Sequence, residues 1–514
     1  MDLRLHKRDF LKLLGGAGAA MAGTGLLARA EAFAQATGKT ALSIAIAQEI
    51  QGTFPFDLGT ATTSTFAQVY DALTERDAEG AVVPGAAESW EVQPDSSWIF
   101  KIRQGISFTN GEPLDAHCVK FTFDQMAAPD NKWGNRADQV SVIERIETLD
   151  DHTVQIFTKV PFGTLPLRLI LFRILPRQYY TEHGEDYVRA NPVGSGPYKF
   201  VAFTPGESYQ MVSNPDYWRG APKITDLTFR VIPDASARVL ALQAGDVDLI
   251  DDVPINEMKR LTAEGRFVTA SAPSTFCFFG QFNTYKDSPL RDVRVRKAIN
   301  MAVDVDTIIE VILEGYAVKL NTVAYNQSFD NYDPAIERDP YDVEAARALL
   351  AEAGQSAGFD LSLVINPAQS GMGEVAQVIA AQLGEIGIRV TVMEKEAGLQ
   401  REQYKTHDVG DIVLMRLGGY HGDGGVVTNL AFAPGTRYSL WEDPGLDKVR
   451  AEMEAATDPA EQKRLNTALQ QQLKDEVPGI VLWQAFINYA HVDTLKGWQA
   501  AATSVITVRD AYFD

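Results

Sequence analysis

The chain has 514 residues, which is too long for one ordinary hydrophobic core and predicts two or three domains. Hydrophobic residues make up 45% and charged residues 22%, values typical of a globular protein, so disorder and collagen-like repeats are excluded. With 68 acidic against 47 basic residues the net charge is -21. Such a surface repels a phosphate backbone, which argues against nucleic-acid binding.

Residues 1–36 have the pattern of an export signal. A basic start precedes a Gly- and Ala-rich apolar section that is too short and too glycine-rich to span a bilayer, and Ala34 and Ala36 form an A-x-A cleavage site. The segment "HKRDFLK" resembles the twin-arginine (Tat) motif with Lys7 in place of the first arginine, which leaves the Tat and Sec routes open. We expect cleavage near Ala36 and a soluble, exported protein.

The first half of the chain is mostly of strand type. "SWIFKI" (97–102) alternates in polarity, and "IETLDDHTVQIFTK" (146–159) predicts two strands around an Asp-Asp turn. "LDAHCVKFTFDQM" (114–126) predicts an intervening helix, because Asp115 is placed to cap its start and the apolar residues that follow share one face. "NPVGSGPYKF" (191–200) is rich in turn formers and marks a crossing between lobes.

The second half alternates helices and strands. Helices are predicted at 343–354, 374–387 and 399–410, each followed by a strand, at 359–366, 388–394 and 411–417. Helices and strands joined by short links indicate parallel βαβ units. The polar segment 324–342, which precedes the first of these helices, is expected to be an ordered loop and not a domain linker.

The residue types and spacings indicate neither an enzyme nor a metal site. The seven histidines have no metal-ligand spacing, "VGSGP" lacks the spacing of a nucleophile elbow or a Walker loop, and no nucleophile–base pair is recognisable. We therefore expect no catalytic residue, no metal and no cofactor. Cys118 and Cys277 lie in apolar runs, which favours two buried thiols over the single disulfide that their number allows.

The segment "LGGYHGDGG" (417–425) directly follows the carboxyl end of a predicted parallel strand, where ligands bind in open α/β sheets. Tyr420 and His421 offer polar or stacking contacts to a ligand, and Gly422 lies beside them. A lone loop histidine is more often simply solvated, and a metal role for His421 is the least favoured reading. In "QGTFPFD" (51–57), Phe56 is a candidate apolar wall of a cleft, with core packing as the equal alternative.

Six segments, in order, resemble the family 5 solute-binding proteins of ABC importers, which bind dipeptides, oligopeptides, nickel chelates or opines. The resemblance covers essentially the whole exported chain, and the matching segments are 85–126, 191–200, 214–234, 241–251, 282–304 and 341–354. It implies an α/β, bilobed periplasmic-binding-protein fold (type II, cluster C-like) with an extra inserted domain. Domain I would comprise 37–75, 193–280 and 490–514, domain II 76–192, and domain III 281–489, with the ligand between domains I and III.

The resemblance also places Asp423 where peptide-binding members hold a carboxylate that faces the α-amino group of the ligand. The alternative is that Asp423 only caps the next helix. The chain departs from the family pattern at Gly424, where proline is usual, at Leu417, where tryptophan is frequent, and in "NPAQSGMGE" (366–374), which lacks an arginine for a dipeptide carboxylate. Longer peptides or opine-like amino compounds would not need that arginine.

The resulting hypothesis is a periplasmic binding protein, monomeric, that captures a small peptide or related amino compound and delivers it to the permease subunits of an ABC importer. The candidate ligand-binding residues are Asp423, Tyr420, His421, Gly422 and Phe56. A nickel-chelate or opine receptor of the same fold is the first alternative. An exported hydrolase using His421 and Asp423, and a chaperone-like peptide binder without a transporter, are the alternatives from other classes.

Overall fold

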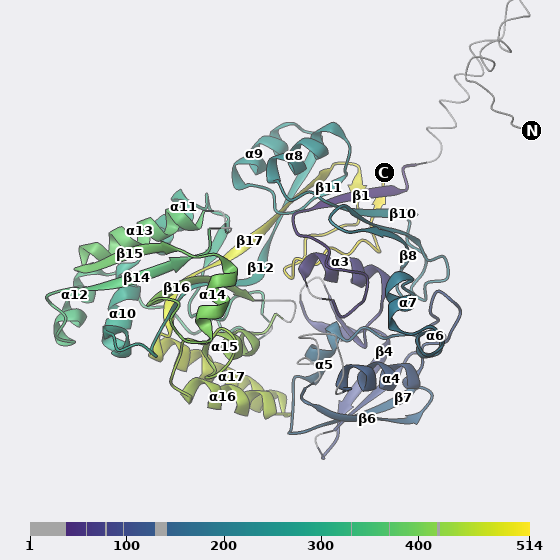
Figure 1. Ribbon diagram of the computed structural model, residues 1–514, viewed down its shortest axis with the longest axis horizontal. Coiled ribbons are helices and arrows are strands. Elements are labelled where there is room, and N and C mark those ends of the chain that lie inside the picture. The colour runs from purple at the N-terminus through teal and green to yellow at the C-terminus, as the bar shows by residue number, and fades with distance from the viewer. Residues whose placement is uncertain are drawn as a thin grey trace, which may run out of the picture.

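A computed structural model gives the fold (Figure 1). It describes residues 38–57, 59–77, 80–95, 97–128, 141–329, 331–367, 369, 371–418 and 422–514. The predicted signal segment 1–36 lies outside these residues.

Within the described residues one 11-stranded sheet passes through both halves of the molecule. Its strands are, in spatial order, β15 (Ile388–Glu394), β14 (Phe359–Ile365), β16 (Ile412–Gly418), β12 (Phe267–Phe282), β17 (Gly479–Val492), β11 (Leu249–Ile250), β1 (Ala41–Ile46), β10 (Asp226–Val231), β9 (Ser208–Ser213) and β8 (Tyr198–Thr204), with β13 (Ala317–Lys319) beside β17. The long strands β12 and β17 run from one half to the other (Figure 1).

The pairing of β12 with β17 is interrupted where the two halves meet. Pro273 pairs with Phe486 and Cys277 with Gln484, so three residues of β12 face one residue of β17. The side-chain amide of Gln484 donates to the carbonyl of Ser274 at 2.6 Å, which satisfies an acceptor within the interruption. We call residues 38–273 and 486–514 the first lobe, residues 277–485 the second lobe, and residues 274–276 the hinge.

The second lobe confirms the predicted βαβ order. Strands β14 and β15 are parallel, as are β14 and β16, and helices precede each of them. The helices of this lobe are η3 (Pro289–Arg291), α10 (Val293–Ala302), α11 (Val305–Val311), α12 (Val343–Glu352), α13 (Met372–Glu385), α14 (Ala397–Tyr404), α15 (Gly424–Phe432), α16 (Gly445–Ala455) and α17 (Pro459–Glu476). The segment 324–342 packs Tyr325, Asn326 and Phe329 into the interior, so it is the ordered loop that its composition predicts.

The first lobe carries a separate four-stranded antiparallel sheet in the order β4-β5-β7-β6. These strands are β4 (Ala87–Val92), β5 (Trp98–Ile102), β7 (Thr153–Thr158) and β6 (Ile143–Asp150). The predicted helix in this part is α4 (Ala116–Ala127), with Asp115 accepting a hydrogen bond from the Cys118 amide at 2.9 Å. Its predicted strands, turn and cap are therefore confirmed.

The remaining elements complete the first lobe. They are α3 (Thr60–Val69), β2 (Thr74–Arg76), β3 (Val82–Pro84), α5 (Leu165–Arg168), η2 (Leu169–Leu171), α6 (Arg177–His183), α7 (Glu185–Ala190), α8 (Ala235–Ala244), α9 (Ile255–Ala263), β18 (Leu495–Lys496) and β19 (Tyr512–Phe513). Side chains of the four-stranded sheet and of the large sheet share one hydrophobic cluster, so the extra sheet is packed onto the first lobe.

The buried residues of the two lobes form separate hydrophobic clusters, and Tyr316 of the second lobe packs against a first-lobe cluster. Cys118 and Cys277 are buried in different clusters and are free thiols, as predicted, and burial raises the pKa of each to about 12. The expected domain boundaries remain predictions; those at 280 and 490 fall inside β12 and β17, which belong to both lobes.

Candidate functional site

The glycine-rich loop begins where β16 ends. A side chain on Gly418 would put its Cβ 2.1 Å from the carbonyl oxygen of Thr275, so only glycine allows the loop to leave the sheet against the hinge. Tyr420 and His421 lie outside the described residues, and their ligand contacts stay predictions. The chain is described again from Gly422, whose φ of 53° is in the left-handed region.

Gly422 lies against the first lobe. A Cβ at this position would be 3.1 Å from Nη2 of Arg76, the last residue of β2. The guanidinium of Arg76 also donates to the carbonyl of Gly80. The loop of the second lobe therefore lies beside a cationic side chain of the first lobe, which a side chain at position 422 would crowd.

Asp423 is 5% exposed and caps α15. Its Oδ1 accepts hydrogen bonds from the Gly425 amide at 2.6 Å and from Nδ2 of Asn331 at 3.1 Å. Both bonds use the same oxygen, and Oδ2 makes no hydrogen bond with the described part of the chain. The capping role is thus present, and it leaves one carboxylate oxygen uncommitted.

The structure gives a reason for glycine, and not proline, after Asp423. A Cβ on Gly424 would be 2.2 Å from the ring of Tyr325, which is fully buried beneath the loop. The Tyr325 hydroxyl donates to Oδ1 of Asn466 at 3.0 Å, which fixes the ring. Burial, and then the charge of Asp423, hold the pKa of Tyr325 well above its ordinary value, so the phenol stays neutral.

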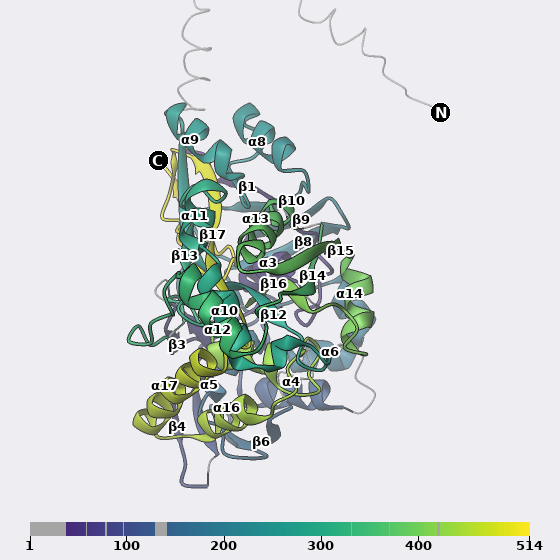
Figure 2. The ribbon, with the colours of Figure 1, turned by 90° about the vertical axis from the view of Figure 1, so that its left-hand side faces the viewer.

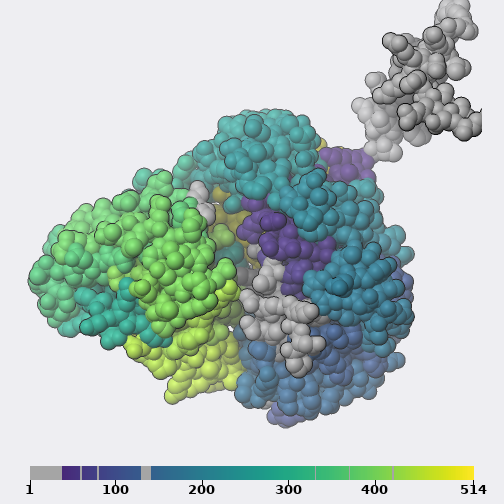
Figure 3. All heavy atoms as spheres, viewed as in Figure 1, coloured from purple at the N-terminus to yellow at the C-terminus, as the bar shows by residue number. Residues whose placement is uncertain are grey.

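Gly422 and Asp423 line an interlobe cavity of about 750 Å³ between the four-stranded sheet and the second lobe. Its walls combine aromatic and polar side chains, among them Trp90, Trp98, Tyr332 and Lys463. Figure 3 shows the face on which a hollow separates the lobes. A cavity of this size, mostly apolar with a few polar groups, has the character of a small-molecule site.

Phe56 lies elsewhere. It is 1% exposed in the core of the first lobe, with its ring in edge contact with that of Phe54 at 5.6 Å. It lines neither the interlobe cavity nor the first-lobe cavity described below. Core packing, the alternative weighed for this residue, is what the structure shows.

Sequence reasoning missed Arg416, two residues before the end of β16. Its guanidinium lies 4.4 Å from the ring centroid of Phe276 in the hinge, and its side chain is exposed. Surrounding protein nevertheless lowers the pKa of this guanidinium, while the charge of Asp252 in the first lobe opposes that effect. Arg416 is therefore an exposed cation beside the hinge, and its only signal in the sequence was an arginine near the end of a buried strand.

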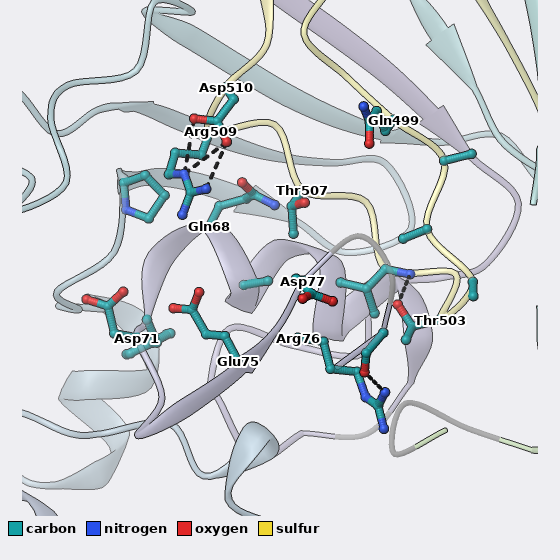
Figure 4. Close-up of a pocket in the computed structure, with 18 of the residues that line it drawn as sticks. Gln68, Asp71, Glu75, Arg76, Asp77, Gln499, Thr503, Thr507, Arg509 and Asp510 are labelled. Atoms are coloured by element: carbon teal, nitrogen blue, oxygen red, sulfur yellow. Dashed lines mark hydrogen bonds and ion pairs between the residues drawn. The ribbon is translucent and has the colours of Figure 1, made fainter. Parts of the chain in front are cut away.

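A second cavity, of about 520 Å³, lies within the first lobe between α3, β2 and the C-terminal segment (Figure 4). Charged side chains surround it, including Asp71, Glu75, Arg76 and the ion pair of Arg509 with Asp510. Asp71 is 3% exposed and accepts hydrogen bonds from the Tyr217 hydroxyl and the Trp218 indole. Among the residues that the structure describes, no group of three or more His, Cys, Asp or Glu side chains is arranged to hold a metal ion.

Comparison with known proteins then decides the family. Residues 81–439, more than half of the chain, match the family described as bacterial extracellular solute-binding proteins, family 5 Middle. The chain belongs to this family. The resemblance inferred from the sequence is therefore confirmed, and within its described part this binding protein has no helix long and apolar enough to cross a membrane.

The binding protein is similar to proteins named for small ligands. It is 26% identical to a glutathione-binding protein of Pectobacterium atrosepticum over 91% of this chain and 93% of that one, and 30% identical to a probable di/tripeptide-binding protein of Pseudomonas aeruginosa over 77% and 81%. Its fold matches NikA of Brucella suis, solved in complex with Fe(III)-EDTA, with a TM-score of 0.82 and 23% identity, covering 92% of this chain and all of the other. The bilobed binding-protein fold is thereby confirmed.

Proposed function

We propose that this binding protein captures a small peptide or a related amino compound between its lobes and delivers it to the permease of an ABC importer. The observation that carries the proposal is the carboxylate of Asp423, which is nearly buried, lines the interlobe cavity and has Oδ2 free of hydrogen bonds to the described residues. A ligand ammonium placed at Oδ2 would form a charge-assisted hydrogen bond in a place from which water is largely removed.

Two further features support a zwitterionic ligand. Arg416 lies beside the hinge and does not line the interlobe cavity, but its guanidinium could meet a ligand carboxylate in place of the arginine absent from 366–374. Two binding proteins similar to it in sequence are named for glutathione and for di- and tripeptides. The proposal includes no catalytic step, and it includes Tyr420, His421 and Gly422 as the remaining ligand contacts of the loop.

We also propose that the protein is exported to the periplasm and acts there as a monomer. The segment 1–36 would direct export, by the Tat or the Sec route, with cleavage near Ala36 and release of a monomer into the periplasm. Amino-terminal sequencing of the protein recovered from the periplasm tests this part. A start far from Thr37, or retention of the whole protein in the cytoplasm, contradicts it.

The ligand class is tested with Asp423→Asn, because asparagine keeps an Oδ1 acceptor for the cap and removes the charge. We expect affinity for di- to tetrapeptides, measured by calorimetry, to fall by about 2 kcal/mol or more, roughly thirtyfold, since a buried ammonium would lose its charged partner. N-acetylated peptides should bind the wild-type protein weakly and lose little further affinity in the variant.

Asp333→Asn is the matched control. Asp333 lines the same cavity, but its two oxygens are occupied by the Ala335 amide at 3.0 Å and the Thr467 hydroxyl at 2.6 Å. Equal affinity losses in both variants would indicate a general effect of cavity charge and remove Asp423 from the ligand role. No change in the melting temperature with any peptide, opine or chelate would overturn the ligand assignment as a whole.

A metal chelate or an opine is the second candidate, favoured by the cation of Arg416, which suits the carboxylates of such compounds. Elemental analysis and mass spectrometry of the protein as purified separate these ligands from peptides.

A further inference from the structure

The described residues of the two lobes also touch away from the glycine-rich loop, in an exposed ion pair of Lys259 with Glu314 and in a largely shielded contact at the turn before α5. The turn before α5 in the first lobe meets the end of α16 in the second, and α16 and α17 lie at the same end of the molecule as β4 and β6 (Figure 2). The Gly163 amide donates to the carbonyl of Glu454 at 2.7 Å. In the same place, Arg168 forms an ion pair with the Glu454 carboxylate, with Nη2 and Oε1 3.1 Å apart.

The contact is tight enough to exclude any side chain at Gly163. A Cβ there would be 1.8 Å from the carbonyl oxygen of Ala456 and 2.8 Å from Nε2 of Gln462, both in the second lobe. Gly163 itself is outside the left-handed region of φ, so its own lobe does not require glycine. The requirement for glycine comes from the opposite lobe.

If the ion pair between Arg168 and Glu454 breaks, the Glu454 carboxylate is still paired with a second arginine. Glu454 is also paired with Arg450 on its own helix, with Nη1 and Oε2 2.5 Å apart, and Arg450 is held in turn by Asp447 at 2.7 Å. The side chains of Arg168 and Glu454 are 19% and 12% exposed, so their pair is largely shielded while the lobes touch. When the lobes separate, Glu454 keeps Arg450, and Arg168 gains water.

The first-lobe side of the contact is rigidly held. Phe162 is buried in the first-lobe core, and its carbonyl accepts a hydrogen bond from the Trp98 indole at 3.1 Å. Trp98 and Gly163 both line the interlobe cavity that Asp423 also lines. Movement at the contact is therefore coupled to the wall of the candidate ligand site.

We propose that Gly163 and Arg168 with Glu454 form a clasp that holds the lobes closed over the interlobe cavity and slows release of the ligand. The ligand part of this proposal rests on the proposed function. The clasp itself does not rest on the proposed function, because its effect on the distance between the lobes can be measured without a ligand. Being partly ionic, the clasp is expected to weaken as the salt concentration rises.

The clasp is tested with Gly163→Ala and Arg168→Gln in the full exported chain. Fluorophores on cysteines introduced at the exposed residues Asp124 and Lys405 report the distance between the lobes. The native thiols do not compete, since both are buried. We expect both variants to shift the unliganded protein towards longer distances and to speed peptide release several-fold in stopped-flow measurements.

Arg464→Gln is the control, because it removes an equivalent pair with Glu461 that is exposed and lies wholly within α17. Circular dichroism checks that each variant is folded. If Gly163→Ala does not fold, Arg168→Gln alone tests the clasp. Distances equal to those of the wild type in a folded variant overturn the clasp, whatever the ligand. Longer distances without any peptide binding support the clasp and count against the proposed ligand alone.

Discussion

Asp71 shows how a single carboxyl group can set a pH dependence. Burial, and then the neighbouring charge of Glu75, raise the pKa of Asp71 to about 6, although Trp218 donates a hydrogen bond to it. The native state therefore binds a proton at this residue more tightly than the unfolded chain does. Stability from this residue is present at low pH and is lost as the pH rises through about 6.

Asp71→Asn removes that titration while keeping an oxygen that accepts hydrogen bonds. We expect the melting temperature of the wild-type protein, relative to the variant, to fall as the pH is raised from 4 to 7. Thermal melts at four pH values measure it, with the exposed Asp124→Asn as the control for loss of one carboxylate. Parallel curves for the wild type and Asp71→Asn would contradict the proton uptake inferred here.

The residues of the glycine-rich loop show which features of the candidate site could be predicted from the sequence. The family pattern located Asp423, and capping chemistry gave its alternative role. Among the described residues, Oδ1 serves the cap and Oδ2 has no partner, and this arrangement includes Asn331, which lies 92 residues away in the chain. The fit of Tyr325 against Gly424 is equally non-local, so no spacing within 417–425 could have predicted it.

Among the elements, α4 has a start that is encoded locally. Asp115 accepts a hydrogen bond from the Cys118 amide at 2.9 Å, and the apolar residues of the helix face the core. Asp115→Ala should lower the free energy of unfolding by about 1 kcal/mol, because the first turn loses its side-chain acceptor. Chemical denaturation measures the loss.

Asp115→Asn is the companion variant, since asparagine caps about as well as aspartate. It should be close to wild type in stability. If both substitutions destabilise the protein equally, the charge or size of Asp115 matters and the cap does not.

The elements that were predicted correctly are those whose pattern is complete within a short window, such as β5, α4, and the βαβ run from α12 to β16. Their periodicity and their capping residues are local properties of the chain. The pairing of β12 with β17 joins residues about two hundred positions apart, and its interruption at the hinge depends on Gln484. Neither the pairing nor its interruption has a local signal in the sequence. The order of the strands and the position of the hinge therefore could not be predicted from the sequence.

At the scale of the whole molecule, the first lobe is assembled from the two ends of the described chain. Gln68 in α3 donates from Nε2 to the carbonyl of Ile506 at 2.8 Å, and its Oε1 accepts a bond from the Val508 amide at 3.4 Å. The Ile506 amide donates to the Ser64 hydroxyl at 3.1 Å. The C-terminal segment is thereby attached to α3 by buried hydrogen bonds.

Gln68→Ala should lower the free energy of unfolding by about 2 kcal/mol, because buried backbone groups of the C-terminal segment lose their partner. The segment should also become sensitive to limited proteolysis, which gel analysis and mass spectrometry detect. Gln499→Ala, at an exposed position of the same segment, is the control and should behave like the wild type. Full protease resistance of Gln68→Ala would show that other contacts hold the segment.

The strand β17 has a consequence for how the protein can be made. It lies at Gly479–Val492, near the end of the chain, yet it pairs with β12 through both lobes and with β11 and β13 on its other side. A growing chain therefore finishes the large sheet of neither lobe until β17 has been synthesised, and these late, long-range pairings are slow to form. A nascent or truncated chain that lacks β17 presents unpaired sheet edges in both lobes at once. We expect such a chain to be bound by chaperones or degraded by proteases.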